Sequence, residues 1–157
     1  MAAPVVSEHS LGAWLLKTRP DSAPLEEWLA SDFAGVTERC VRPTYRAGLV
    51  RAGQPVLLWV SGSDPRHPAG IHAHGRATGP VRADPVSGLV LPVSLRRTEP
   101  PVARGDLRAL PVLRDIEVLR MPAGSNPSYL DRGAYAALCD SFPQLRLSSR
   151  TTPRLDR

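Results

Sequence analysis

Hydrophobic residues along this chain fall mostly into short segments of strand length. Residues 13–17 form an apolar run that ends at a charge, and residues 56–60 form an unbroken apolar run, typical of a strand buried on both faces. Residues 71–78 and 89–95 instead alternate between apolar and polar positions, as strands with one buried face do. Residues 116–120 are interpreted as a further strand. The pattern therefore predicts five strands.

Two other segments carry apolar residues at helical spacing. In the first segment the apolar residues fall at i, i+3 and i+4, and they are Leu25, Trp28 and Leu29. In the second they fall at i, i+3 and i+7, and they are Tyr135, Leu138 and Phe142. Ser22 is a plausible N-cap for the first helix and Asp131 for the second. Residues 106–110 are long enough for one or two helical turns, whereas Pro43 and Gly48 would break any long helix nearby.

Five strands and two or three short helices, with turns between neighbouring strands, predict a fold of the α+β class. We expect a small curved β-barrel of about five or six strands flanked by short helices. The 157 residues fit one domain, which we place at 12–143. Residues 1–11 are expected to form a loose leader, and residues 144–157 a basic flexible tail.

Composition excludes several classes of protein. No stretch approaches the ~20 apolar residues that span a bilayer, so no membrane is expected as a partner. The first nine residues have no basic region leading into an apolar run, and we expect no signal peptide. Two cysteines are too few for a disulfide scaffold or a cysteine-based zinc site. A reducing, cytoplasmic location is the simplest expectation.

The positive charge is unevenly placed. The formal net charge is +5, and the segment from Arg146 to the end contributes +3 of it. Lys17 is the only lysine, so arginine supplies nearly all of the positive charge. Together with the 17 prolines, this is what a GC-rich coding bias produces. The alternative is selection for nucleic acid, because a guanidinium suits planar contacts with phosphates and bases.

Sequence motifs for catalysis are scarce. The chain contains no glycine-rich phosphate loop and no Gly-x-Ser-x-Gly motif. His72 and His74 would point to the same face of a strand, and with His67 they could hold a metal or act as acid–base groups. The alternative is a solvated polar strand face. Cys40 lies near arginines that could activate its thiol, but it has no obvious histidine partner and is otherwise an inert cysteine.

One segment favours binding over catalysis. Arg39, Arg42, Arg46 and Arg51 surround Tyr45, and only Glu38 opposes them. Basic residues interleaved with an aromatic ring are typical of nucleic-acid grooves, where charge contacts phosphate and the ring stacks on a base. An arginine-rich surface exposed to solvent explains the same residues without a ligand.

Four motifs in order resemble the EVE domain family. Residues 14–20, which read Trp-Leu-Leu-Lys-Thr-Arg-Pro, are similar to the family's opening Trp-Leu-x-Lys-Ser-Glu-Pro strand. Residues 45–62 resemble its basic segment, turn and central strand, and residues 69–78 its next strand. Residues 124–130, with the helix after them, are similar to its closing motif. The resemblance extends over residues 12–142.

The resemblance implies a PUA-like fold, related to the YTH readers of methylated RNA. Members of the EVE family are thought to hold a flipped, modified base in a pocket with aromatic walls. The resemblance therefore implies a non-catalytic module that needs no cofactor or metal and binds DNA or RNA carrying a modified base. A metal-dependent or acid–base enzyme using His72 and His74 is one alternative, and a protein-interaction adaptor is another.

The family's pocket residues can be carried over to matching positions here. Trp59 would form an aromatic wall, unless it is simply a core tryptophan. The other positions implied for the base pocket are Lys17, Thr18, Ser61, Gly62, Ser125 and Asn126. Ser125 and Asn126 could equally do no more than shape a turn. Contacts to the nucleic-acid backbone would come from Arg42, Tyr45 and Arg46.

The chain also departs from the family pattern. Thr18 and Arg19 replace the common Ser-Glu pair, so a negative charge becomes positive. His72 and His74 occupy positions where an aromatic and an aliphatic residue are expected. These departures leave the preferred base open.

Overall fold

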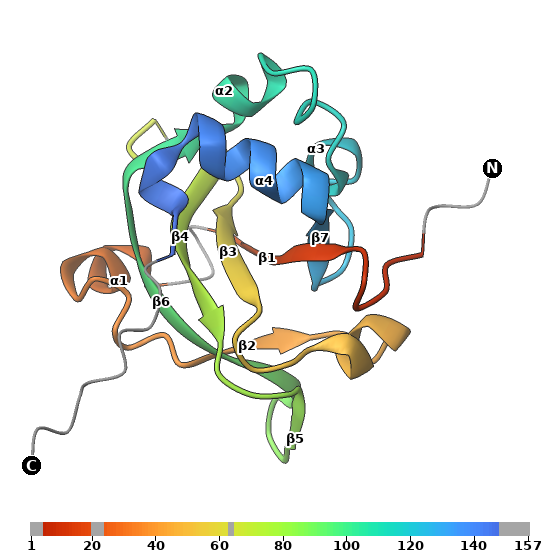
Figure 1. The fold of residues 1–157 in the computed structure, drawn as a ribbon. Coiled ribbons are helices and arrows are strands. Elements are labelled where there is room, and N and C mark those ends of the chain that lie inside the picture. Colours follow the sequence, from red (N-terminus) through yellow and green to blue (C-terminus); the bar gives the residue numbers. More distant parts are fainter. Residues whose placement is uncertain (1–4, 20–23, 63–64, 148–157) are drawn as a thin grey trace, which may run out of the picture.

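The structure is a computed structural model that describes residues 5–19, 24–62 and 65–147. Seven strands form one mixed sheet, which curls into a half-barrel, and a few short helices pack around it (Figure 1). The α+β prediction with a curved sheet is therefore confirmed, and the half-barrel is compatible with a PUA-like fold. The strands are β1 (Leu11–Thr18), β2 (Glu38–Val41), β3 (Pro55–Val60), β4 (Gly70–Ala77), β5 (Arg82–Asp84), β6 (Gly88–Ala103) and β7 (Ser128–Asp131).

The helices are all short. The α-helices are α1 (Leu25–Ala30), α2 (Arg104–Arg108), α3 (Glu117–Arg120) and α4 (Arg132–Ser141), and the 3-10 helices are η2 (Tyr45–Leu49) and η3 (Pro143–Leu145). The predicted cap of α4 is present, because the Asp131 carboxylate accepts a hydrogen bond from the Ala134 amide at 2.8 Å. The predicted cap at Ser22 lies outside the described residues. In the described part of the chain, no helix has the length and apolar character needed to cross a bilayer.

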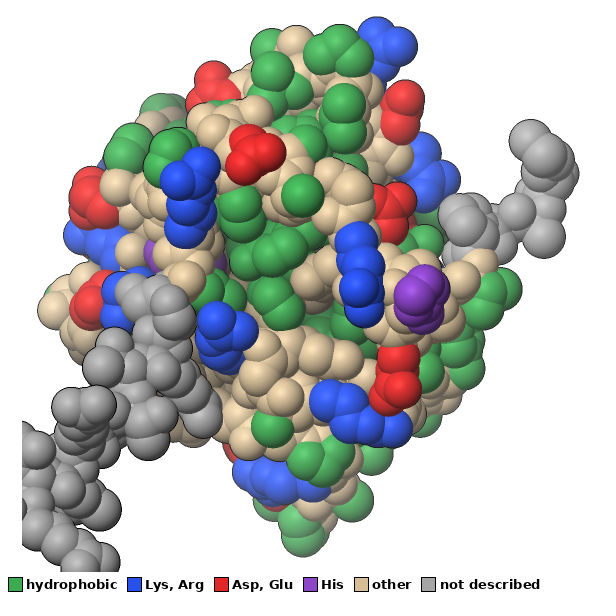
Figure 2. Space-filling view, viewed as in Figure 1, with side chains coloured by type: hydrophobic (Ala, Val, Ile, Leu, Met, Phe, Trp, Pro, Cys, Tyr) green, Lys and Arg blue, Asp and Glu red, His purple; other side chains and the backbone are tan. Residues whose placement is uncertain are grey.

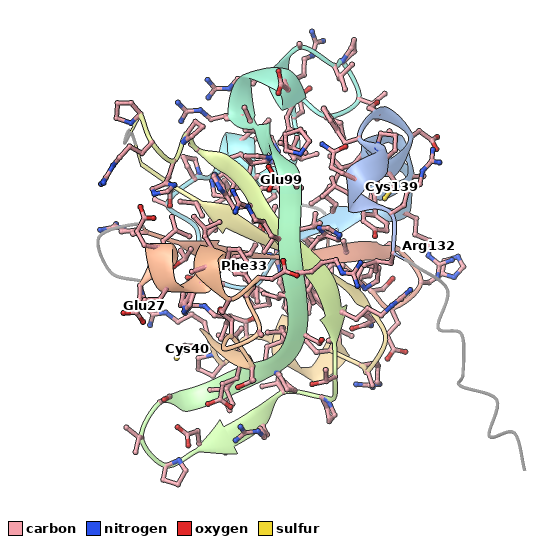
Figure 3. The ribbon with its side chains drawn as sticks, turned by 90° about the vertical axis from the view of Figure 1, so that its left-hand side faces the viewer. Glu27, Phe33, Cys40, Glu99, Arg132 and Cys139 are labelled. Carbon is pink, nitrogen blue, oxygen red and sulfur yellow. The ribbon has the colours of Figure 1, made fainter. Side chains whose placement is uncertain are left out.

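The sheet has the order β2-β6-β4-β3-β1-β7, and β5 pairs with β6. The central pair β1 and β3 is parallel, and the other pairs are antiparallel. Strand β6 extends from the hairpin with β5 at one end of the molecule to α2 at the other (Figure 3). Because β1 and β3 run in the same direction, their carboxyl ends meet at one edge of the fold.

Each face of the sheet carries its own hydrophobic core. Trp14 and Leu16 of β1 lie inside the curl, together with Phe33 and residues of β2 and β6. Ala13 and Leu15 point to the other face, which α2, α3 and α4 cover. The unbroken apolar runs of β1 and β3 follow from this arrangement, because a strand between two cores buries every side chain.

Most predicted elements are confirmed, and one is wrong. Strands at 13–17, 56–60, 71–78 and 89–95 correspond to β1, β3, β4 and the first half of β6. Residues 116–120 do not form a strand but contain the single-turn helix α3. The apolar residues that suggested a strand include Ile116 and Val118, which are buried in the second core. Strands β2, β5 and β7 were not predicted.

The two predicted terminal segments contact the domain where the structure describes them. Val6 is buried, and its amide donates a hydrogen bond to the Tyr45 hydroxyl. Leu145 is fully buried in the second core, within the region assigned to the tail. The remainder of the predicted tail, residues 148–157, lies outside the described residues.

Candidate functional site

A cavity of about 300 Å³ opens where β1 and β3 end, and we name it the strand-end cavity. It is lined by Lys17, Thr18, Arg19, Arg39, Ser61, Pro122, Ala123, Gly124 and Asn126. Four of the residues expected in a base pocket are therefore together: Lys17, Thr18, Ser61 and Asn126. They come from two strand ends and from the loop before β7, which are far apart in the sequence.

The parallel pairing of β1 and β3 brings Thr18 and Ser61 together. Thr18 is in register with Val60, the last residue of β3. The Ser61 amide and hydroxyl both donate to the Thr18 carbonyl, at 2.9 and 3.1 Å. These bonds continue the ladder by one residue beyond the sheet and hold the Ser61 hydroxyl at the cavity.

Asn126 holds the loop before β7 against β1. Its Oδ1 accepts from the Lys17 amide at 2.8 Å, and its Nδ2 donates to the Lys17 carbonyl at 3.0 Å. The side-chain amide thus bonds both backbone groups of Lys17, just beyond the pairing of Leu15 with Ser128 in β7. A primary amide offers two donor hydrogens and two acceptor lone pairs, so one of each is still available to a ligand.

Arg39 of β2 lines the same cavity and is not fully paired. Its guanidinium lies 5.1 Å from the centre of the Trp28 ring, and Nη2 donates to the Thr18 hydroxyl at 3.2 Å. Its Nε is buried and has no hydrogen-bond partner in the described part of the chain. Burial lowers the pKa of Arg39. An unpaired, buried guanidinium N–H is costly to the folded state.

Lys17 supplies a second cation. Its ammonium donates to the Met121 carbonyl at 3.3 Å and lies at the mouth of the cavity, near Gly124. Burial lowers the pKa of Lys17 more than the nearby Glu117 carboxylate raises it. The described lining contains no carboxylate, so the cavity is suited to acceptor atoms and negative charge.

A wider groove of about 690 Å³ adjoins the strand-end cavity at Asn126. Arg42 lines this groove, and its amide donates to the Asn126 carbonyl at 2.9 Å. Tyr45, the aromatic residue of the basic segment, is 53% exposed. Arg42 and Tyr45 therefore remain candidates for contact with a nucleic-acid backbone.

Arg46, also predicted to contact a nucleic-acid backbone, is paired within the fold. Its two terminal nitrogens donate to the Glu117 carboxylate at 2.6 and 2.8 Å, one of them also donates to the Pro127 carbonyl, and the guanidinium lies over the Tyr129 ring. The hydrogen bonds to Glu117 raise the pKa of Arg46. These contacts hold the guanidinium within the fold, so the structure gives Arg46 a stabilising role.

Trp59 lies in the second hydrophobic core and is only 3% exposed. The structure therefore favours the alternative of a core tryptophan over an open aromatic wall. Gly62 and Ser125 are exposed and lie next in sequence to lining residues, but neither lines the cavity itself. The described lining contains no aromatic side chain.

The two histidines of β4 do not form a solvated strand face, because each is only 4% exposed. A ring nitrogen of His72 pairs with the Pro68 carbonyl, and one of His74 pairs with the Thr98 hydroxyl. Burial lowers the pKa of both histidines. Within residues 5–19, 24–62 and 65–147, no cluster of three or more His, Cys, Asp or Glu could hold a metal ion.

Sequence reasoning missed Arg39 and Arg19 as lining residues. Arg39 was noted only as part of the basic segment, since β2 itself was not predicted. The signal that could have found it is the short sequence Glu38–Val41, which can form an edge strand, but its pairing with β6 depends on tertiary structure.

Comparisons with known proteins inform the fold only. No protein-family model matches the sequence, and a search of curated proteins finds no similar sequence. Among solved structures, a protein from Rhodopseudomonas palustris is similar over 87% of this chain and 97% of its own, with a TM-score of 0.65 and 15% identity. A hypothetical protein from Leishmania major is similar over 85% and 96%, with a TM-score of 0.63 and 14% identity. A protein from Agrobacterium tumefaciens is similar over 82% and 91%, with a TM-score of 0.62 and 15% identity.

Proposed function

We propose that this chain is a non-catalytic nucleic-acid-binding module of the EVE type, which takes a modified base into the strand-end cavity. The observation that carries the proposal is the meeting of Lys17, Thr18, Ser61 and Asn126 in one cavity. The EVE resemblance points to these residues in three separate motifs, and the fold brings them to one cavity. A chance set of surface residues would not be expected to line a single cavity.

The chemistry of the cavity suits the polar edge of a base. The Lys17 ammonium and the Arg39 guanidinium line the cavity and would offer hydrogen bonds to carbonyl oxygens and ring nitrogens. The Asn126 amide has one donor and one acceptor site left for the same edge. Flipping a base costs a few kcal/mol, and charge-assisted hydrogen bonds of this kind would offset it.

Stacking would differ from that in the family's aromatic pocket. Trp59 is buried, so the flat surface offered to a base is the Arg39 guanidinium, held against Trp28. Bases stack on arginine planes as well as on aromatic rings in single-stranded recognition. In this proposal Arg39 has two functions, as a stacking surface and as a donor.

Backbone contacts would come from Arg42, which lines the groove beside the cavity, and from Tyr45, which is exposed nearby in the sequence but does not line the groove. On the face of the molecule in Figure 2, Lys and Arg side chains lie scattered between hydrophobic and uncharged surface and do not form one basic patch. Local contacts at the groove would therefore contribute more to affinity than a broad positive field on that face.

A binding titration at two salt concentrations tests the proposal. Labelled single-stranded and duplex oligonucleotides, of DNA and RNA, would each carry one methylated, hydroxymethylated or plain base. We expect one modified base to bind more tightly than the plain base, and all binding to weaken at higher salt, because phosphate contacts release counterions. Equal affinity for every base, or no binding at all, would contradict the proposal, and the latter would favour an adaptor.

Two variants distinguish base binding in the cavity from backbone contacts in the groove. Lys17→Met should reduce the preference for the modified base, because it removes a donor from the cavity. Arg42→Ala should weaken modified and plain oligonucleotides alike, since it removes only a backbone contact. Arg108→Gln, at an exposed position in α2 outside both sites, is the charge-matched control. If Arg42→Ala alone abolished the preference, the base would be bound in the groove instead.

A further inference from the structure

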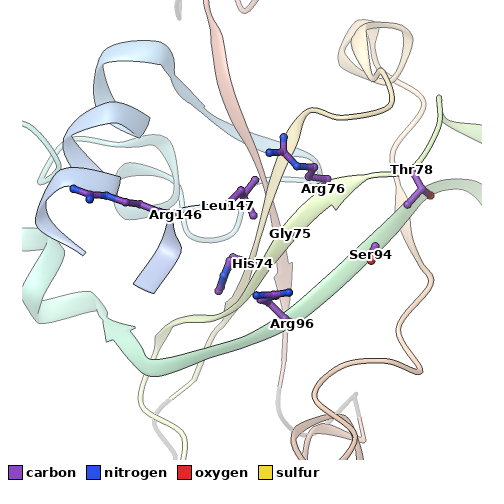
Figure 4. A pocket seen from close by; sticks show the side chains of 8 residues that line it. All are labelled: His74, Gly75, Arg76, Thr78, Ser94, Arg96, Arg146 and Leu147. Atoms are coloured by element: carbon purple, nitrogen blue, oxygen red, sulfur yellow. The ribbon is translucent and has the colours of Figure 1, made fainter. Parts of the chain in front are cut away.

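A second basic cavity lies on the outer face of the sheet, and we name it the β4–β6 cavity. It has a volume of about 230 Å³ and is lined by His74, Arg76, Thr78, Ser94, Arg96 and Arg146, with Gly75 and Leu147 (Figure 4). We propose that this cavity binds a phosphate group, in a site separate from the strand-end cavity. The proposal does not depend on base recognition.

Strand pairing explains why these residues share one face. His74 is in register with Arg96, and Arg76 is in register with Ser94, across the antiparallel pair of β4 and β6. Because side chains alternate along a strand, all four point to the same side of the sheet. Their neighbours Ala73, Ala77, Val93 and Leu95 point the other way, into the core inside the curl. The four polar residues therefore face outward.

The chain returns over this face after η3. The Leu145 side chain is buried in the second hydrophobic core. This anchors the chain here, and the next residue, Arg146, lines the cavity. Its Nε donates to the Cys139 carbonyl at 3.3 Å, and a terminal nitrogen lies 3.8 Å from the exposed Asp140 carboxylate. Arg146 therefore borders the cavity but is partly bound to α4.

Arg76 and Arg96 are the residues best placed to bind a ligand. One terminal nitrogen of Arg76 donates to the Gly53 carbonyl at 2.8 Å, which anchors the side chain and leaves its other N–H groups for a ligand. The Arg96 side chain is exposed and makes no hydrogen bond or ion pair with any described residue. It lies beside His74, its partner across the strand pair. The described lining contains no carboxylate to neutralise these cations.

These features favour a compact anion. Planar guanidinium groups match phosphate oxygens in paired hydrogen bonds, and Arg76 and Arg96 both line the cavity. Thr78 and Ser94 add hydroxyl donors. The cavity is several times larger than the ~30 Å³ that one water occupies in the liquid, so a phosphate group fits. Burial and the Arg96 charge lower the pKa of His74, although the Asp32 carboxylate acts in the opposite direction.

The two cavities lie at opposite ends of the paired strands β3 and β4. Arg76 pairs with Pro55 at the start of β3, whereas Ser61 follows the end of that strand. A strand rises about 3.3 Å per residue, so the sites are roughly 20 Å apart. The phosphate could belong to a small molecule or to the backbone of a nucleic acid, and the experiment distinguishes these two sources.

The first arm of the test uses inorganic phosphate. Isothermal titration and thermal melting would be recorded with added sodium phosphate, against sodium chloride at equal ionic strength. We expect phosphate to bind and to raise the melting temperature beyond the chloride control. Arg96→Gln should weaken that binding by about tenfold, since a charged hydrogen bond is lost. Arg108→Gln, which removes the same charge elsewhere, should leave it unchanged.

The second arm uses a plain oligonucleotide without a modified base. If the phosphate belongs to a nucleic-acid backbone, Arg96→Gln should weaken this binding and reduce the salt slope by about one, relative to Arg108→Gln. An effect of Arg96→Gln in either arm supports the proposal and identifies the source of the phosphate. If Arg96→Gln and Arg108→Gln behave alike in both arms, the proposal is overturned. That result would leave the strand-end cavity unaffected, because Arg96 does not line it.

Discussion

Arg39 and Arg46 belong to the same basic segment of the sequence, yet the fold places them in opposite environments. Arg46 faces the Glu117 carboxylate and makes two charged hydrogen bonds with it. Arg39 faces Trp28 and the strand-end cavity, and its buried Nε has no partner in the described part of the chain. The fold brings a carboxylate to Arg46, whereas the described lining of the cavity beside Arg39 contains none.

The largest effect on stability should come from breaking the ion pair between Arg46 and Glu117. Arg46→Met removes the main partner of Glu117, whose side chain is only 14% exposed in the intact pair, and this should reduce the free energy of unfolding by about 3 kcal/mol. Urea unfolding would measure this. The double variant Arg46→Met with Glu117→Gln should lose less than the two single variants together. A loss below about 1 kcal/mol would mean that the pair is only a surface contact.

Asn126 lies between the two environments and should have the next largest effect on stability. Asn126→Ala removes both hydrogen bonds to the Lys17 backbone, at a cost of about 2 kcal/mol, since the freed groups are partly buried. Ser125→Ala, at the exposed neighbouring position, is the matched control and should change stability by less than about 0.5 kcal/mol. Equal unfolding curves for the two variants would contradict the role assigned to Asn126.

Low pH should weaken the ion pair between Arg46 and Glu117. Burial alone would raise the pKa of Glu117, but its hydrogen bonds with Arg46 and Ser128 outweigh burial, and the pKa lies below its ordinary value of 4.5. Because the folded pKa is depressed, this stabilisation is present above about pH 4.5 and is lost as pH falls through the folded pKa. Between pH 7 and pH 3, the free energy of unfolding should fall less in Glu117→Gln than in the natural chain. Parallel curves would contradict the assignment.

The smallest effect on stability should come from Arg39. Arg39→Gln removes a cation–π contact and one hydrogen bond, but it also removes a buried N–H without a partner. These changes oppose each other, so the free energy of unfolding should change by less than about 1 kcal/mol. A loss as large as that of Arg46→Met would show that Arg39 also serves the fold and would remove the contrast between the two arginines.

Hydrophobic periodicity predicted the elements whose burial follows from their own sequence. The strands β1, β3 and β4 and the helix α4 show patterns of the right period and length. The strand predicted at residues 116–120 was wrong because an apolar segment of only five residues also fits one helical turn. The second half of β6 was missed because Pro100 and Pro101 suggested a connector. They lie where the pairing of β6 with β4 shifts register, and there a strand tolerates proline.

The candidate site was only partly predictable for the same reason. The EVE resemblance identified Lys17, Thr18, Ser61 and Asn126, and the strand ends bring them together. It could not show that Glu117, 71 residues away in the sequence, occupies the Arg46 guanidinium. The alternation of apolar and polar residues along β4 could not show that His72 and His74 are buried. Alternation shows which face of the strand a residue is on, but not what packs against that face. Partners distant in sequence decide which polar groups remain available.

The most direct test of the account compares Arg39→Gln with Arg108→Gln in oligonucleotide binding. Both variants lose one positive charge, but only Arg39 lines the strand-end cavity. We predict that Arg39→Gln weakens binding to the preferred oligonucleotide by about tenfold or more, because a charged donor is lost, whereas Arg108→Gln changes it by less than about twofold. If the two variants bind alike, the strand-end cavity does not hold the base.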